Sequence, residues 1–561
     1  MLSKILVDQK TKGQFDEFDY KVTPDILPDL SQDQFVEVNF GGKKKLGIIS
    51  SIAKKTSDRK LKSIGKIVYP GLKICAWQKQ LARFIALEYA TNFSQALFSI
   101  IPPLARTFSY PKSQSVSTAY SESFVIKSKL DRFLVFRKIK TKKIIIFPEI
   151  IEAKIYQKYF EKNAIIFHSG LNLKKKSEIF IRALNGDYQT IVGTYSAMFL
   201  SFSNHCLIME SYLSPMYEKD SSPKYNILEL VKKLAKVKQL KIILADDMVD
   251  LFGQTKNFPT VKNIKYRLSI SPQKLLANIQ FTGKNLVYFP TASGYRLIKC
   301  ATCQQIVKCK KCQKILSSNG NFIPTVCSYC GETQNQNGLC PKCHSAKLTY
   351  LVPGIKTIFE GLKTKKFILC DRDTTSLPPN FTNVIATSRI FSFPMKKFDS
   401  VWAFFPNYYF HLASFRQKEN IAYLIYRLKN LTENLNIVVS SKTQIHFLRE
   451  ALSPNFASQE LELRKRYRFP PFWNLWILRG EKISLGLYKK IVYNLEKESS
   501  VEFIHKNFKE GQVEIYLKAP KVYQLKYDQI VPLIAEKNNE AHSPELLKEF
   551  SYISRRLSQL Q

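Results

Sequence analysis

Eight cysteines between residues 300 and 343 form the most specific chemical pattern in the chain. They fall into four C-x2-C pairs, and each pair is typical of a tight turn that directs two sulfurs at one point: Cys300/Cys303, Cys309/Cys312, Cys327/Cys330 and Cys340/Cys343. Zn²⁺ takes four ligands in a tetrahedron, and a set of four thiolates without a water position is a structural site. The pattern predicts two such zinc sites, and the spacing leaves open which pairs share a metal.

The alternative is a framework of disulfides, which is typical of small secreted chains. This chain has 561 residues, and its first residues lack a hydrophobic run of signal-peptide length. Its remaining cysteines are isolated in apolar runs, where we expect buried thiols: Cys75, Cys206 and Cys370. These features favour zinc over disulfides, and they favour a cytoplasmic protein.

The net charge points to a polyanionic partner. The chain holds 86 lysines and arginines against 45 acidic residues, a formal charge of +41. Nucleic acid is the leading candidate, because the cations are spread along the chain among 28 tyrosines and 39 phenylalanines, which suits backbone contacts and base stacking. A basic bias of the whole proteome and attraction to an anionic membrane are the alternatives. We expect no membrane association, because no basic amphipathic helix and no apolar run of about 18 residues is present.

The spacing of apolar residues predicts a small β-rich module followed by alternating strands and helices. In residues 1–104, two apolar strands at 36–40 and 46–49 flank a basic turn, and a helix follows over 77–97. From about residue 115 to 290, short apolar strands alternate with helical segments, which predicts a parallel sheet covered on both faces. Those strands are expected at 143–147, 164–167, 189–192, 206–209 and 241–244.

The first module is similar to the N-terminal DNA-binding domain of the primosomal protein N′ (PriA) family of replication-restart helicases. The resemblance rests on "FDY" at 18–20, "VEVNFGGKKKLGIISSI" at 36–52 and "LARFIALEYATNFSQALFSIIPPL" at 81–104. In that family, this domain binds the 3′ end of a nascent strand at a fork. By motif, the pocket residues fall on Asp19, Gly41 and Lys62. A carboxylate accepts hydrogen bonds from base edges, glycine permits close approach of the backbone, and lysine neutralises phosphate.

The resemblance continues through most of the chain and implies the full architecture. It implies an α/β fold with two RecA-like helicase lobes, a two-zinc insertion, and a small α+β domain at the end. The segments that carry it include "FHSGL" (167–171), "GDYQTIVGTYSAMF" (186–199), "GIKTIFEGLKTKKFILCDRDTTS" (354–376) and "QELELRKRYRFPPFWNLWIL" (459–478). The expected boundaries are 1–104 for the DNA-binding domain, 115–278 for lobe 1, 279–479 for lobe 2 with the zinc insertion at 300–343, and 480–561 for the C-terminal domain and tail.

Two finer expectations follow from the same resemblance. The outer cysteine pairs share one zinc and the inner pairs the other, which gives one site from Cys300, Cys303, Cys340 and Cys343 and a second from Cys309, Cys312, Cys327 and Cys330. The basic and aromatic residues at 464–469 suit contact with single-stranded DNA, and a solvated helix end is the alternative.

The motifs for ATP chemistry are absent where the family has them. A phosphate loop needs glycines, and the corresponding stretch, about 119–126, has none; no glycine occurs between Gly71 and Gly170. The acidic quartet that binds magnesium and orients water corresponds to residues 210–213, where only Glu210 is acidic. The coupling motif at 245–248 also departs, and the arginine fingers fall near Leu431 and Asn434. About fifteen residues separate Pro103 from the phosphate-loop position, too few for the family's winged-helix domain.

The resulting hypothesis is a DNA-binding replication-restart protein of the primosome that recognises forked or branched DNA with an inactive motor. Its cofactors would be two Zn²⁺ ions, while the missing motifs disfavour ATP and Mg²⁺. Its partners would be forked or single-stranded DNA, with a single-strand-binding protein and loading factors of the replicative helicase as candidate protein partners. One alternative is an active ATP-dependent 3′-5′ DNA helicase with an unrecognised nucleotide site. The other is a zinc-dependent RNA-binding protein that reuses the fold.

Overall fold

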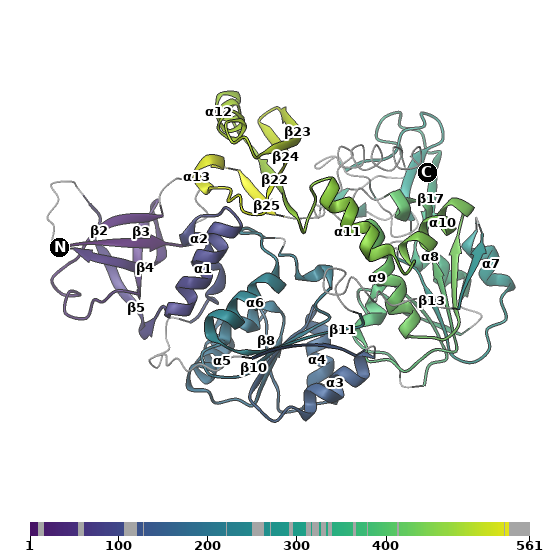
Figure 1. Cartoon of the computed structure of the whole chain (residues 1–561), viewed down its shortest axis with the longest axis horizontal. Coiled ribbons are helices and arrows are strands. Elements are labelled where there is room, and N and C mark those ends of the chain that lie inside the picture. The colour runs from purple at the N-terminus through teal and green to yellow at the C-terminus, as the bar shows by residue number, and fades with distance from the viewer. Residues whose placement is uncertain are drawn as a thin grey trace. The chain divides into compact units, whose positions relative to one another are not determined.

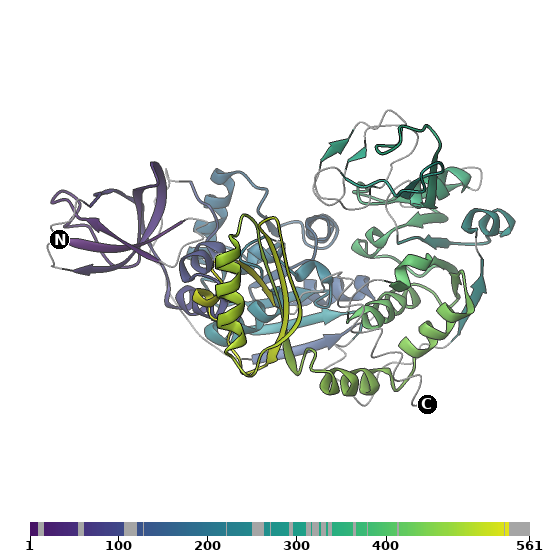
Figure 2. The same ribbon diagram turned by 90° about the horizontal axis from the view of Figure 1, so that it is seen from above.

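The computed structural model describes most of the chain, in two compact units. The described residues are 1–8, 16–53, 61–105, 120–126, 128–219, 221–248, 263–269, 271–290, 295–309, 316, 325–326, 332–334, 339–362, 366–378, 380–411, 415–531 and 533–537. One unit comprises residues 1–126, 132–253 and 458–561, and the other comprises 127–131 and 254–457. Figures 1 and 2 show the elements of both units. None of the described helices is long and apolar enough to cross a membrane.

The N-terminal module is a five-stranded antiparallel sheet in the order β2-β1-β4-β3-β5. Its strands are β1 (Leu2–Val7), β2 (Glu17–Lys21), β3 (Gln34–Phe40), β4 (Lys43–Ala53) and β5 (Ile64–Lys73). The predicted hairpin is confirmed, with Gly41 and Gly42 as its turn. Both glycines have positive φ, +56° and +76°, which side chains other than glycine rarely adopt. The sheet also closes on itself, because the backbone N–H of Lys21 donates to the carbonyl oxygen of Lys62 just before β5.

The single helix predicted for residues 77–97 is two helices, α1 (Ala76–Glu88) and α2 (Phe93–Ile100). The chain breaks at Ala90, whose φ of +45° ends the helical path. Asn92 then begins the second helix, since its side-chain oxygen accepts the backbone N–H of Gln95. Apolar spacing alone did not reveal this break, because both helices bury one face in the same core. The core extends into the parallel sheet of this unit, where the ring of Trp77 lies 5.7 Å from that of Phe202.

The first parallel sheet has six strands in the order β6-β11-β10-β7-β9-β8. Its strands are β6 (Tyr120–Val125), β7 (Lys143–Ile146), β8 (Ile165–Phe167), β9 (Thr190–Gly193), β10 (Cys206–Glu210) and β11 (Lys241–Asp246), and its helices are α3 (Lys129–Lys138), α4 (Ile150–Tyr159), α5 (Leu173–Asn185), η1 (Tyr195–Leu200), η2 (Pro215–Tyr217) and α6 (Ile227–Lys238). The five predicted strands are confirmed. Helices α3 and α4 lie on the opposite side of the strands from α5 and α6 (Figure 1). Right-handed crossovers require this placement, because the chain first moves along the sheet in one direction and then returns.

The second parallel sheet, in the other unit, has the order β12-β21-β20-β13-β19-β18. Its strands are β12 (Ile264–Leu268), β13 (Asn285–Tyr288), β18 (Phe367–Cys370), β19 (Asn383–Ala386), β20 (Ser400–Phe404) and β21 (Leu435–Val439). Its helices are α7 (Pro272–Asn278), α8 (Ile355–Leu362), η4 (Ser388–Ser392), η5 (Asn407–His411), α9 (Gln417–Asn430) and α10 (Lys442–Ala451). Numbered along the chain, the strands of both sheets follow one order, 1-6-5-2-4-3. The chain therefore contains one topology twice, and the sequence shows no repeat that reveals it.

Two expected boundaries are wrong. The second sheet begins with β12 and α7, upstream of the expected start at 279, because β12 pairs in parallel with β21. The C-terminal sheet begins before residue 480, because β22 (Trp473–Gly480) belongs to it. That antiparallel sheet has the order β23-β24-β22-β25, with β23 (Glu502–Lys509), β24 (Gln512–Pro520) and β25 (Ile534–Lys537). Helices α11 (Phe456–Arg466), α12 (Leu485–Glu496) and α13 (Tyr527–Ile530) accompany it, and the expected tail beyond residue 537 lies outside the described residues.

The cysteine-rich insertion interrupts the second sheet between its strands β13 and β18. Its described strands are β14 (Tyr295–Cys300), β15 (Thr325–Val326), β16 (Thr333–Gln334) and β17 (Leu348–Pro353). Strands β14 and β17 pair antiparallel, which places Cys300 opposite Leu348. The two ends of the insertion therefore return to the same place.

Gly193 ends β9 where no larger residue fits, which gives a test of the first sheet. The Cβ of an alanine there would lie 1.9 Å from the backbone oxygen of Phe167, and that oxygen cannot move without disturbing β8. We expect Gly193→Ala to lower the free energy of unfolding by about 3 kcal/mol. The matched control is Gly361→Ala in α8, where no atom lies within 4 Å of the added Cβ and stability should stay level or rise by up to about 1 kcal/mol. Thermal unfolding measures both, and equal melting temperatures would contradict the observed β8–β9 register.

Candidate functional site

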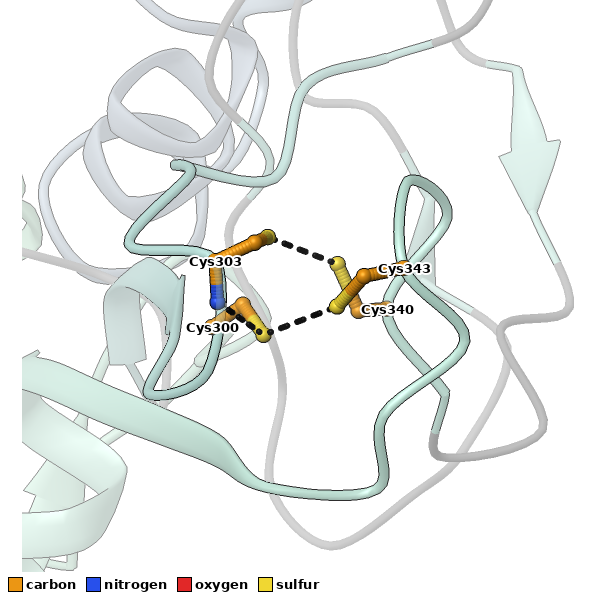
Figure 3. A group of neighbouring side chains, drawn as sticks. All are labelled: Cys300, Cys303, Cys340 and Cys343. Atoms are coloured by element: carbon orange, nitrogen blue, oxygen red, sulfur yellow. Dashed lines mark hydrogen bonds between the residues drawn. The ribbon is translucent and has the colours of Figure 1, made fainter.

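Four cysteines converge at the ends of β14 and β17 into one compact group. The sulfurs of Cys300, Cys303, Cys340 and Cys343 all lie within 4.8 Å of one another (Figure 3). The sulfur of Cys300 is 3.5 Å from that of Cys343, and the sulfur of Cys303 is 3.7 Å from that of Cys340. This is the set that the outer-pair arrangement implies. Four sulfurs at these distances can hold a metal ion, and they match the donor set of a structural tetrahedral site.

The local contacts lower the pKa of Cys300 and raise that of Cys343, where burial and the three neighbouring sulfurs outweigh the backbone N–H of Ser345. The N–H of Cys303 lies 3.5 Å from the sulfur of Cys300 and donates to it, and this contact lowers the pKa of Cys300 to about 6. Only the thiolate is a metal ligand, so a lowered pKa favours metal binding at neutral pH. The hydroxyls of Thr302 and Ser345, 2.8 Å apart, join the two turns beside the sulfurs. The two knuckles are thus held together by protein contacts as well as by the ligands.

The expected second group is only partly described. Cys309 is buried with Ile298, Val307 and Leu316 in a small apolar cluster. Its expected companions, Cys312, Cys327 and Cys330, lie outside the described residues. Of the three isolated cysteines, Cys206 and Cys370 are buried as expected, and Cys75 is half-buried at the start of α1.

The three residues expected to hold a 3′ end lie on neighbouring segments of the N-terminal module. Asp19 is exposed in β2, opposite Lys4 of β1. Its neighbours contact the other two segments: the hydroxyl of Tyr20 donates to the carbonyl oxygen of Asn39, two residues before Gly41, and Lys21 bonds to Lys62 through the backbone. An added Cβ at Gly41 would meet no atom within 4 Å, so the turn is open to a ligand. Among the described residues, no hydrogen bond or ion pair joins the side chains of Asp19 and Lys62, and the pocket that they would share with Gly41 stays a prediction.

The site that corresponds to the missing ATP chemistry holds a buried ion cluster that the sequence did not indicate. We call Arg132, Glu210 and Asp247 the Arg132 cluster. The guanidinium of Arg132, on α3, donates to both oxygens of Glu210, with distances of 2.9 Å from Nε to Oε2 and 2.8 Å from Nη2 to Oε1. Its Nη1 lies 2.8 Å from Oδ1 of Asp247 and 2.6 Å from the carbonyl oxygen of Ile126. The side chains of Arg132 and Glu210 are 0% exposed.

The topology of the sheet explains why these groups meet. Strands β6, β11 and β10 are neighbours in parallel, so their carboxyl ends lie at one edge. Ile126 follows β6, Asp247 follows β11, and Glu210 ends β10. Burial alone would lower the pKa of Arg132, but the carboxylates of Glu210 and Asp247 outweigh burial and raise its pKa well above the usual value. The arginine is therefore charged at every physiological pH.

The surrounding groups complete the hydrogen bonding of the cluster. The hydroxyl of Ser211 donates to Oε1 of Glu210 at 3.1 Å. The neighbouring carboxylate of Asp246 accepts the backbone N–H groups of Leu213 and Asp247 at 2.8 and 2.6 Å. The hydroxyl of Tyr217 donates to the backbone oxygen of Glu210 at 2.7 Å. Arg132 and Phe133 both belong to the buried face of α3, and the local sequence pattern does not indicate the cluster.

The structure also places the stretches that correspond to other ATP motifs. Most of the expected phosphate-loop stretch, 119–126, is strand β6. That strand ends at Val125 and α3 begins at Lys129, so only residues 126–128 connect them. In the second sheet, Leu431 caps the end of α9, and the side-chain amide of Asn434 donates to the backbone oxygen of Asp399 at 3.0 Å. Asn434 precedes β21 and therefore lies at the amino end of that strand, away from the carboxyl edge where ligands bind in such sheets.

The basic segment at 464–469 is partly buried and partly exposed. Arg464 is 2% exposed and its Nε lies 2.9 Å from Oε1 of Glu460. Arg468 pairs with Glu502 and stacks over the ring of Trp473. Phe469 is buried, and the amine of Lys518 lies 4.4 Å from its ring centre. Lys465 and Arg466 remain exposed at the end of α11. Three of the four cations in this segment, Lys465, Arg466 and Arg468, are thus exposed.

Comparison with known proteins supports the resemblance seen in the sequence. Residues 4–102 match the family model described as the 3′DNA-binding domain (3′BD) of PriA. The replication restart protein PriA of Helicobacter pylori strain J99 is 23% identical over 359 residues, which cover 55% of this chain and 58% of the relative. PriA of Synechocystis is 22% identical over 259 residues, which cover 38% and 31% of the two chains. PriA of Bacillus subtilis is 21% identical over 271 residues, or 42% and 34%.

The chain thus carries, at residues 4–102, a module that matches a 3′DNA-binding domain, and two parallel sheets follow it. The relatives that the chain resembles are replication restart proteins PriA, at 22–23% identity. The chain spans about half the length of the first two of them.

The cysteine group gives a direct test of metal binding. We expect Cys343→Ser to lower the metal content of the purified protein by one equivalent per chain, because a hydroxyl replaces one of four thiolates. Elemental mass spectrometry after dialysis measures the change. The matched control is Cys75→Ser, which changes an isolated half-buried thiol and should leave the metal content unchanged. Unchanged metal in Cys343→Ser would exclude this group as a metal site.

Proposed function

We propose that the protein is a DNA-binding replication-restart factor that recognises forked DNA through the 3′ end of a nascent strand. The observation that carries this proposal is the match of residues 4–102 to the 3′ DNA-binding domain. The formal charge of +41 supports it, since neutralised phosphates supply most of the affinity of proteins for DNA. The proposed pocket consists of Asp19, Gly41 and Lys62, on segments that touch through Tyr20 and Lys21.

We further propose that the two parallel sheets are RecA-like helicase lobes that serve as a scaffold. Their shared strand order supports a pair of related lobes. Three features support an inactive motor: the short connection after β6, the absence of glycine between Gly71 and Gly170, and the engagement of Glu210 with Arg132. A phosphate loop wraps backbone N–H groups around phosphates, and residues 126–128 are too few to do so.

The proposed cofactors are two Zn²⁺ ions, one held by Cys300, Cys303, Cys340 and Cys343 and one by the inner pairs. The four-sulfur group supports the first ion, and the spacing of Cys309, Cys312, Cys327 and Cys330 supports the second. Zinc would fix the insertion as a rigid surface beside the second sheet. We propose that this surface meets single-stranded DNA or a protein of the replication-restart machinery, such as a single-strand-binding protein or a helicase-loading factor.

The pocket proposal is tested with forks that differ only at the 3′ end. We expect Lys62→Ala to weaken binding about tenfold on a fork whose nascent 3′-hydroxyl lies at the branch, because a charge-assisted contact of about 1.4 kcal/mol or more is lost. Binding to the same fork with a blocked 3′ end should change little. Fluorescence anisotropy at fixed salt measures both.

The matched control is Lys73→Ala, which removes an exposed lysine from β5 of the same module. It should weaken binding to both forks equally, as a general electrostatic contact does. Equal losses in Lys62→Ala would contradict the pocket. Tighter binding of structured RNA than of either fork would instead favour the RNA-binding alternative.

The inactive-motor proposal is tested by ATP turnover. We expect the purified protein to hydrolyse no ATP above background, with or without saturating fork DNA, while it binds the fork in the same buffer. The physical reason is the missing phosphate loop and the serine, Ser211, that follows Glu210 where the family's motif has a second acidic residue. Fork-stimulated hydrolysis that disappears in Glu210→Gln would establish an active helicase and overturn the proposal.

A further inference from the structure

The Arg132 cluster places charge where the fold does not require it. Glu210 is the last residue of β10, which is the fifth strand of the first sheet in chain order. The fifth strand of the second sheet in chain order is β20, and its last residue is Phe404. Phe404 is buried in an apolar core. Two sheets of one topology therefore fill the same position with a buried carboxylate and with a phenyl ring. Burying a carboxylate costs several kcal/mol before it is compensated, so the charge in the first sheet calls for a specific partner.

The oxygens in this cluster form a donor set for a cation. Glu210 and Asp247 present carboxylates toward one point, and the backbone oxygen of Ile126 faces the same point from the end of β6. Carboxylate and carbonyl oxygens are the ligands that Mg²⁺ and Ca²⁺ prefer. In the structure, these oxygens converge on the guanidinium of Arg132. Three neighbouring strand ends thus share one cationic group, and that group belongs to the chain itself.

We propose that Arg132 is a built-in cation that occupies a divalent-cation site at the carboxyl ends of β6, β10 and β11. This proposal rests on the proposed function only where it treats the site as part of a former motor. The argument for the cation site itself depends only on the contacts of the Arg132 cluster. The guanidinium supplies one positive charge and a planar set of N–H donors, which match a carboxylate in a bidentate pair. A metal ion would supply two charges at shorter distances but would depend on its concentration. The arginine makes the compensation permanent.

A consequence of this assignment is that removal of the guanidinium uncovers the cation site. In Arg132→Ala, the buried carboxylates of Glu210 and Asp247 lose the guanidinium that both of them contact. Such a pair either takes up a proton or binds a cation, because like charges at short distance cannot both stay ionised in a buried site. The variant should therefore be less stable, and Mn²⁺ or Mg²⁺ should restore part of what is lost.

The experiment measures melting temperatures of the full chain, loaded with zinc, in buffer freed of other divalent ions by a chelating resin. We expect Mn²⁺ to leave the wild-type melting temperature unchanged. We expect Arg132→Ala to melt several degrees lower, and we expect Mn²⁺ to raise its melting temperature in a saturable way, as a ligand of the folded state does. If Arg132→Ala is recovered folded only when Mn²⁺ is present, the same conclusion follows.

The control variant combines Arg132→Ala with Glu210→Gln and Asp247→Asn, which keeps the shape of the site and removes its charge. Its melting temperature should not respond to Mn²⁺, which separates this site from the cysteines and from surface carboxylates. A second variant, Arg132→Met with Glu210→Met and Asp247→Leu, replaces all three charged groups with apolar ones and should fold without added metal. It shows whether the position tolerates an uncharged filling.

Two results would overturn the proposal. One is an Arg132→Ala variant whose melting temperature, or recovery in folded form, is the same with and without Mn²⁺. The other is a wild-type protein that responds to Mn²⁺ as strongly as Arg132→Ala does. Neither result depends on DNA, so a failure of this proposal is distinct from a failure of fork recognition, which is measured on the wild-type protein by anisotropy.

Discussion

Parallel pairing of non-consecutive strands is the constraint on which the chemistry of this protein depends. In each parallel sheet, all carboxyl ends lie at one edge, so residues far apart in the chain meet there. Arg132, Glu210 and Asp247 come from separate segments, and only the adjacency of β6, β11 and β10 brings them within hydrogen-bond distance. At this edge the side chains of Arg132 and Glu210 are fully buried. Because these charged groups are buried, each one needs a partner of opposite charge for the protein to stay stable.

The cysteine group also depends on a cation, but there we expect a metal ion rather than a side chain of the protein. Its segment is short and offers little apolar surface, with a small cluster around Val307 and Leu316 among its described residues. Burial alone cannot stabilise such a segment, so the free energy of metal binding has to serve as folding free energy. The Arg132 cluster lies against the large core of its unit and obtains its counter-charge from the chain. A bound metal ion thus suits the cysteine-rich insertion, and the guanidinium of Arg132 suits the first parallel sheet.

The sequence predicted those features that depend on local patterns. Strand periodicity located β7 to β11, the paired glycines located the turn at Gly41, and the C-x2-C spacing located the four-sulfur group. It could not predict features that depend on tertiary contacts. The break at Ala90 is invisible to apolar spacing, because α1 and α2 share one buried face. The role of β12 in the second sheet depends on its pairing with β21, some 170 residues away. Arg132 gave no signal, because a lone arginine on a helix is ordinarily a surface residue.

The buried cluster also bears on how a scaffold can hold DNA steadily. A motor lobe works because a nucleotide and its metal enter and leave, and each exchange changes the charge at the strand ends. A ligand shifts an equilibrium only through its different affinity for two states. In the proposed scaffold, with Arg132 fixed between Glu210 and Asp247, the charge at that edge would not change with a nucleotide, and the first sheet would have no such signal to transmit. The protein would then contact DNA in one constant arrangement. Steady contact of this kind serves recognition of a fork, whereas translocation along DNA requires the contact to be released and remade.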